Sequence, residues 1–331
     1  MRKLTYLSDI AVVVGCAVGV GFLSGKEAQI FFGNVTNVAI FAVTFALINV
    51  IFREYCRKRN CGNVAKLSVC CFKRYAIAFD LCISACCFVC VVTMLAGVEQ
   101  CISNILPVSA FPLYALVTAV IATAVMQRGL SALKTANFIS IALAVTLIVI
   151  LYLTGNGKET TVTNDVPAYN PIAYALFTFV MSFGVTTTLG SQSGKRRNVI
   201  CSLISAAVIA LMMIAVMGLS DFSLSMPVID GITDPFLLAL AVITLILSAV
   251  TGIVANAMPI VSEINALIND RTLSAAAVFT LALSMSMFGF DFALKYGYML
   301  VGVVGAITLA VTVCRQIKTV KKSVRSVNVP Q

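Results

Sequence analysis

Two apolar stretches of the chain are interrupted by residues that weaken a helix, and such interruptions can expose peptide groups for binding. Four glycines lie within residues 14–25, and residues 177–192 mix two glycines with serines and threonines. Each glycine in a helix costs about 1 kcal/mol relative to alanine. Free N–H groups would bind a carboxylate, and free carbonyl oxygens would bind a hard cation. The glycines of 14–25 also form two GxxxG pairs, a spacing typical of close helix packing.

The residues that several other kinds of functional site require are missing from the sequence. Histidine is absent and no GxxxxGK[ST] sequence occurs, which removes most zinc sites, histidine-based triads and the phosphate-binding loop of ATP-driven pumps. We therefore expect no enzyme activity. Cys82, Cys86 and Cys90 recur at helical spacing, and cysteine thiolates can bind copper(I). Cysteine more commonly packs as a small apolar residue, so copper is the minor alternative.

The elements that must position these residues are membrane helices. Of 331 residues, 60% are hydrophobic and 11% are charged, whereas about a quarter are charged in soluble domains. The apolar blocks are long enough to cross ~30 Å of hydrocarbon as helices. We predict an all-α polytopic membrane protein with ten transmembrane helices. The predicted spans are 10–32, 35–52, 75–98, 111–126, 136–153, 171–189, 199–219, 236–261, 273–290 and 296–313.

Basic residues alternate between the segments that join these spans. With a cytoplasmic amino terminus, all 23 Lys and Arg residues except Lys26, Lys158 and Lys295 fall on the cytoplasmic side. This distribution follows the positive-inside rule. It predicts a multi-pass protein of the cell (plasma) membrane with both termini cytoplasmic. The lipid bilayer, rather than nucleic acid, then accounts for the net charge of +10.

Ten spans divide into two sets of five, which must insert with opposite orientations. A single transmembrane domain at 1–331 then contains a first repeat at 1–153, a second repeat at 154–313 and a cytoplasmic tail at 314–331. The two interrupted stretches become the first span of each half. Interrupted helices at corresponding positions of an inverted repeat indicate a solute site near the membrane centre.

Short strings within these spans resemble a known superfamily. The string GCAVGVG at 15–21 closely resembles the unwound first helix of LeuT-type amino acid transporters. The longer string VGVGFLSGKE at 18–27 resembles the YkvI-like bacterial membrane proteins of the same amino acid-polyamine-organocation superfamily, and residues 177–184 resemble the sixth helix of the leucine transporter. The resemblance implies a LeuT-like 5+5 inverted repeat in which helices 1 and 6 are discontinuous.

The resemblance places a solute at the two interruptions. It implies that backbone amides of the first interruption hold a substrate carboxylate, that Phe183 lines the side-chain pocket, and that Phe177 forms an aromatic lid on the outer side. Ordinary aromatic packing is the alternative for each phenylalanine. The residues assigned to the substrate are Gly19, Val20, Gly21, Phe22, Phe177, Val180, Phe183 and Thr186.

The resemblance also implies a sodium ion. Its ligands would be the carbonyl oxygens of Gly15 and Val18 and the hydroxyls of Ser248 and Thr251, since oxygen ligands suit a hard cation. Gly252 stands where the family has a second adjacent hydroxyl residue, and a lone hydroxyl in a membrane helix commonly bonds its own backbone. The coupling ion therefore stays open, and no other cofactor is expected.

Three charged residues are assigned to gates. Lys26 lies near the position of the family's gating arginine, and Asp291 or Glu27 would be its partner. On the inner side, Asp9 is expected to pair with a basic residue at 2–3, with helix capping as the alternative. Such ion pairs would close the two ends of a solute pathway.

Together these implications favour a secondary active transporter that moves a small amino acid or a related small organic solute by alternating access. No charged side chain is expected at mid-depth, which favours a solute with an uncharged side chain. The alternative is a ligand-sensing membrane subunit on the same fold that binds without turnover. The sequence leaves the oligomeric state open.

Overall fold

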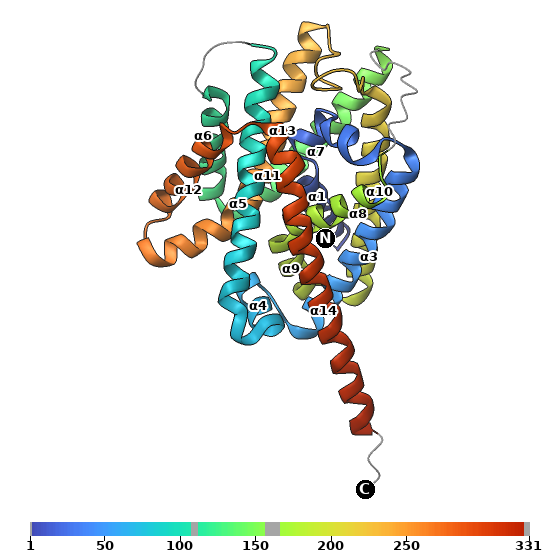
Figure 1. The fold of residues 1–331 in the computed structure, drawn as a ribbon, viewed down its shortest axis with the longest axis vertical. Coiled ribbons are helices and arrows are strands. Elements are labelled where there is room, and N and C mark those ends of the chain that lie inside the picture. The colour runs from blue at the N-terminus through green and yellow to red at the C-terminus, as the bar shows by residue number, and fades with distance from the viewer. Residues whose placement is uncertain (1, 107–111, 156–165, 328–331) are drawn as a thin grey trace.

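The computed structural model describes residues 2–106, 112–155 and 166–327, and every regular element in those ranges is a helix. Figure 1 shows these helices as one bundle. The elements of the first half are α1 (Arg2–Ala17), α2 (Val20–Leu23), η1 (Ala28–Phe32), α3 (Val35–Arg59), α4 (Val64–Phe72), η2 (Lys73–Tyr75), α5 (Ala76–Ser103), α6 (Leu113–Gln127) and α7 (Gly129–Leu153). The elements of the second half are α8 (Tyr169–Met181), α9 (Phe183–Gln192), α10 (Lys195–Leu219), α11 (Pro235–Ile268), α12 (Arg271–Ser286), α13 (Phe290–Phe292), η3 (Ala293–Gly297) and α14 (Tyr298–Val327).

Within the described ranges, six helical segments are long and apolar enough to cross a membrane, and the bent pair α8–α9 makes a seventh. Three shorter apolar helices, which overlap the predicted first, fourth and ninth spans, have 10–17 residues each. An all-helical membrane protein is therefore what the structure shows. The count of ten crossings and the inverted repeat stay predictions.

Short polar residues begin several of the long helices. The side chains of Asn34, Asn63, Asp234 and Asp270 accept hydrogen bonds from backbone N–H groups in the first turn of α3, α4, α11 and α12. Pro235 is the first residue of α11, where its missing N–H costs nothing. These caps satisfy N–H groups that have no partner inside a helix and set where each apolar segment starts.

The two halves of the chain pack into each other. Helix α3 of the first half contacts α8, α9 and α10, whereas α11 of the second half contacts α5, α6 and α7. In Figure 1, α6 and α12 lie on one side of the bundle, and α3 and α10 lie on the other. Helix α1 contacts α7, α8, α9, α10 and α11. The interrupted first span therefore lies inside the bundle, among elements of both halves.

Two predicted boundaries differ from the structure. The inner stretch 53–74, which joins two predicted spans, is largely helical, because α3 continues to Arg59 and α4 follows it. Helix α14 runs to Val327, so most of the predicted tail at 314–331 continues the last helix beyond the bundle (Figure 1). A hydropathy pattern places the end of a span at its first charged residues. The helix itself can continue past them, because long basic side chains can extend to the polar region.

Candidate functional site

The first predicted interruption is a break in the helix. Helix α1 ends and α2 begins on either side of Val18 and Gly19, and Gly19 is extended at φ −103° and ψ −167°. Among the backbone hydrogen bonds of the described residues, none is donated by the N–H groups of Val20, Gly21 or Phe22. These are the amides that the family resemblance assigned to a substrate carboxylate.

The same glycines allow close packing. A Cβ atom at Gly15 would clash with the side chain of Asn137 on α7, and a Cβ atom at Gly21 would lie 2.5 Å from Oε1 of Glu27. Helix breaking and close packing, the two interpretations of the glycine spacing, therefore both apply to this segment. It is broken, and polar side chains lie directly against its backbone.

The second predicted interruption is a bend. Helices α8 and α9 meet at Ser182 with an angle of 68° between them. Ser182, at the bend, bonds to both helices: its N–H donates to Thr178 O at 3.1 Å, and its carbonyl oxygen accepts from Thr186 N–H at 2.8 Å. Thr186 Oγ1 is buried and has no hydrogen-bond partner. The bend thus contributes one buried hydroxyl without a partner.

The aromatic residues assigned to the substrate lie in two separate clusters. Phe177 stacks on Tyr298 of α14 with ring centroids 3.4 Å apart. Phe183 packs against Phe52 and Phe179, at centroid distances of 4.9 Å and 5.6 Å. Phe177 therefore contacts the last long helix, whereas Phe183 lies against α3.

Glu27 is a buried carboxylate that the sequence analysis named only as a possible partner of Lys26. Its residue is 1% exposed. The Tyr298 hydroxyl donates to Oε1 at 2.8 Å, and the Tyr174 hydroxyl donates to Oε2. The expectation that no charged side chain lies at the interruption is therefore wrong, because a turn after α2 folds Glu27 back against Gly21. The sequence did contain a signal for Glu27, since an ionisable residue in an apolar span marks a functional site.

Oxygen atoms gather where a sodium ion was expected. Ser248 Oγ lies 2.7 Å from Ser140 Oγ of α7, and Thr251 Oγ1 donates to the Ser248 carbonyl oxygen at 2.9 Å. Asn137 is fully buried against Gly15, and neither atom of its amide has a hydrogen-bond partner. Ser140 and Asn137 of α7 were not identified from the sequence, because the pattern of one span does not show which helix its polar residues face.

Charged residues pair at both predicted gates. Lys26 Nζ lies 3.2 Å from Asp291 Oδ1 and donates to Ser225 O at 3.0 Å. Asp9 Oδ2 accepts from Arg197 Nε of α10 at 2.8 Å. Arg197 was not the predicted partner, and the side chains at positions 2 and 3 lie outside the described part. A residue far along the chain provides this contact, which spacing within one segment could not indicate.

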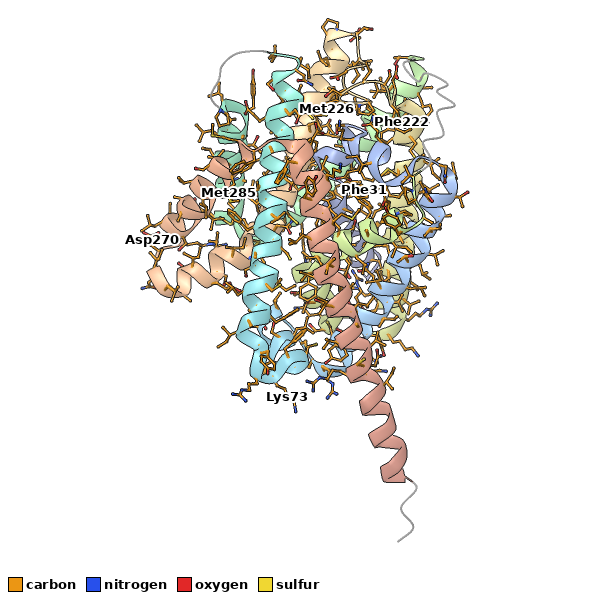
Figure 2. All side chains as sticks on the ribbon, in the orientation of Figure 1. Phe31, Lys73, Phe222, Met226, Asp270 and Met285 are labelled. Carbon is orange, nitrogen blue, oxygen red and sulfur yellow. The ribbon has the colours of Figure 1, made fainter. Side chains whose placement is uncertain are left out.

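The segment between α10 and α11 covers the first interruption. Val228 N–H donates to Ser24 O at 3.0 Å, and Gln29 Nε2 donates to Phe222 O at 2.7 Å. Figure 2 shows Phe222 at the same end of the bundle as Phe31 of η1. We call this the outer end, and the end with α4 the inner end, following the predicted orientation. The outer end is closed over the break.

A cavity of about 390 Å³ lies at the inner end. It is lined by residues of α1, α4, α7, α9 and α11, among them Gly184 and Thr188 beyond the bend, and Lys134 and Glu263. Ala65 and Glu263 of its lining are exposed, so the cavity reaches the surface. The bent span is therefore accessible from the inner end, while the outer end is closed.

The copper alternative receives no support. Cys82 is exposed, whereas Cys86 and Cys90 are buried. In the part of the chain that the structure describes, no three His, Cys, Asp or Glu residues are grouped so that they could hold a metal ion. Cys86 and Cys90 pack as small apolar side chains.

Solved transporter structures share this fold. The structure of MhsT in complex with L-phenylalanine has a TM-score of 0.68 and 15% identity, over 92% of this chain and 87% of that one. The inward-facing conformation of Mhp1 has a TM-score of 0.64 and 13% identity, over 93% and 75%. Closed Mhp1, a nucleobase-cation-symport-1 family transporter with bromovinylhydantoin bound, has a TM-score of 0.59 and 14% identity, over 92% and 77%. These are LeuT-fold proteins, so the predicted fold is supported, while membership of the YkvI-like family stays a prediction. No family profile and no curated protein matches the sequence.

Proposed function

We propose that this protein is a secondary active transporter that moves a small organic solute, an amino acid or a related compound, across the cell membrane by alternating access. The observation that carries the proposal is the pair of interrupted spans inside the bundle, with a closed outer end and a cavity at the inner end. Unwound backbone within a membrane is tolerated where it faces protein or a water-filled pathway. The shared fold supports the proposal because the fold is one that transporters use.

In this proposal the structure corresponds to an inward-open state. The Lys26–Asp291 pair and the covering segment close the outer end. The cavity below the bend provides a route to the inner side. For the pathway to open outward, the Lys26–Asp291 contact would separate and the helices around the cavity would close. The Asp9–Arg197 pair, proposed as part of the inner gate, is already formed in this structure and would stay formed.

Sodium is the coupling ion that the residues fit. Asn137 presents a buried amide without a partner beside Gly15, and amide oxygens are suitable ligands for a hard cation. In this proposal Thr251 and Ser248 of α11 add hydroxyl oxygens, and Gly15 and Val18 add carbonyl oxygens. A bound sodium ion would couple solute movement to the sodium gradient. We assign the proposed site to Gly15, Val18, Asn137, Ser248 and Thr251.

Uptake into proteoliposomes tests the function. Labelled amino acids and amines are offered to the purified protein with and without an inward sodium gradient. We expect accumulation or exchange that empty liposomes do not show. Thr251→Val and Asn137→Ala are expected to reduce the response to sodium, whereas Thr146→Val, which changes an exposed hydroxyl of α7 bonded to its own helix, is expected to retain it. Solute uptake by the unaltered protein that does not depend on sodium would exclude the proposed ion site.

The ligand-sensing subunit remains the second candidate. Gly252, in place of the family's second hydroxyl residue, favours it because one expected ion ligand is missing. A sensor binds its ligand without moving it. Saturable binding with neither accumulation nor exchange would favour sensing over transport.

A further inference from the structure

Glu27 is a buried acidic residue for which the described part of the protein provides no cation. Its carboxylate is enclosed by the bundle, and among the described ion pairs none includes Glu27. Lys26, the adjacent cation in the sequence, pairs with Asp291 instead. A buried carboxylate without a cation is costly, so the site favours a positively charged ligand.

The two hydrogen bonds to Glu27 leave part of its capacity to accept hydrogen bonds unused. Each carboxylate oxygen accepts one tyrosine hydroxyl, from Tyr298 and from Tyr174. An ionised carboxylate offers about four acceptor positions. About half of the acceptor capacity of Glu27 is therefore not used by these two bonds, and an ammonium group, which is a donor only, could take it.

Aromatic rings surround the same carboxylate. Tyr298 stacks on Phe177, and Phe31 lies 5.3 Å from Tyr174 and 5.8 Å from Tyr298, measured between ring centroids. The faces of such rings attract cations, and the attraction strengthens where water is excluded. The rings and the carboxylate therefore favour the same class of ligand, an organic cation.

The position of Glu27 also disfavours one class of solute. Its Oε1 atom lies against Gly21, in the segment whose free amides would otherwise hold the carboxylate of an amino acid. Two carboxylates cannot both stay ionised at low cost in one buried site. The carboxyl group of Glu27 thus stands where the carboxyl group of the solute would have to lie.

We propose that the solute is an organic amine without a carboxylate, and that Glu27 binds its ammonium group within the enclosure of Phe31, Tyr174, Phe177 and Tyr298. This proposal rests on the proposed function and narrows its substrate class to amines. The enclosure is closed in this structure. The amine would therefore reach Glu27 in a state in which Tyr298 and the outer half of the first span have separated.

Matched ligand sets test the proposal on the unaltered protein. Each set contains an amino acid, the amine that lacks its carboxyl group, and the acid that lacks its amino group, such as leucine, 3-methylbutylamine and 4-methylpentanoate. Binding is measured by calorimetry and by thermal shift. We expect the amine of at least one set to bind at least about tenfold more tightly than its amino acid, and the acid not to bind. An amino acid that binds as tightly as its amine, or a complete lack of amine binding, would overturn the proposal.

A variant locates the binding group. Glu27→Gln keeps the size of the side chain and an oxygen for the tyrosine hydroxyls but removes the charge. We expect it to weaken amine binding at least about tenfold, whereas Glu54→Gln, which changes an ion pair within α3, leaves the affinity unchanged. Equal losses in the two variants, or none in Glu27→Gln, would contradict the assignment. If Glu27→Gln does not fold, the comparison of ligand affinities within each set, made on the unaltered protein, still tests the proposal.

The uptake experiment separates this proposal from the proposed function. Amine binding without accumulation or exchange would support the amine site and reject transport. Accumulation of an amino acid with exclusion of its amine would support transport and reject the amine site.

Discussion

The two interruptions of the bundle differ in the polar groups that lie at them. At the first, α1 and α2 are separated, three amides are left without backbone partners, and a buried carboxylate lies against Gly21. At the second, α8 and α9 bend by 68° around Ser182, which bonds to Thr178 and Thr186 on either side, and no charged residue lies within the bend. The first interruption thus provides polarity, and the second provides shape and one free hydroxyl. If this contrast is correct, removal of polar groups at the first interruption should affect both stability and binding, whereas removal of the unpartnered hydroxyl at the second should affect binding alone.

The largest effect is expected from Gly21→Leu. Its side chain would occupy the space of the Glu27 carboxylate, because even a Cβ atom would lie 2.5 Å from Oε1. We expect solute binding to be lost while the protein still inserts into the membrane, as measured by calorimetry on detergent-purified protein. Gly194→Leu is the matched control, since nothing lies within 4 Å of a Cβ atom there. Unchanged affinity in Gly21→Leu would remove the first interruption from the site.

Tyr298→Phe tests the polar side of the contrast. The variant keeps the stacked ring but removes the hydroxyl that donates to Glu27. Hydrogen bonds to charged groups contribute about 1.5–3 kcal/mol, so we expect a loss of unfolding free energy in that range. Thermal unfolding in detergent measures it, with Tyr169→Phe, an exposed tyrosine of α8, as the control. A variant as stable as the control would mean that the Glu27 contact does not stabilise the fold.

Thr186→Val tests the second interruption. Its buried hydroxyl has no hydrogen-bond partner, so its removal is expected to leave stability unchanged and to weaken solute binding by about tenfold or less, which is up to about 1.4 kcal/mol. Thr187→Val should do the opposite. Its hydroxyl donates to Phe183 O at 2.7 Å, so about 1 kcal/mol of stability should be lost with little change in affinity. If both variants lose stability equally, the hydroxyl of Thr186 has a structural partner rather than a solute.

The smallest effect is expected from Lys26→Met. Asp291 is 60% exposed, and an exposed ion pair contributes about 0–1 kcal/mol. We expect a small loss of stability that disappears at high salt, measured by thermal unfolding over a range of salt concentrations. Asp291→Asn should cause no larger loss, because it keeps the bond from Lys26 to Ser225 O, and the double variant should lose no more than Lys26→Met alone. Additive losses would show that the two residues do not act as a pair.

The sequence predicted the two interruptions because their signal is local. Glycines at 15, 19, 21 and 25 weaken one span, and serine, threonine and glycine weaken the other, so composition alone indicated where regular helix would fail. It did not distinguish a break from a bend. That difference depends on how each segment packs against other helices, which the composition of one segment does not show.

Partners that lie far apart along the chain were the main omissions. Asp9 pairs with Arg197 of α10, and Asn137 of α7 lies against Gly15 of α1. Periodicity describes the face of one helix at a time. The face that another helix presents to it is set by packing, which a single sequence does not display.

Composition and residue order by themselves determined that this is a helical membrane protein, because 60% hydrophobic residues in long blocks can satisfy their backbone in lipid only as helices. They also determined where two of those helices would be weakest. Only the tertiary structure decided what lies at the weak points. The fold brings α8 and α14 against the outer half of the first span, so two tyrosines enclose Glu27, and burial makes the ionised form of this acidic residue costly unless a cation joins it.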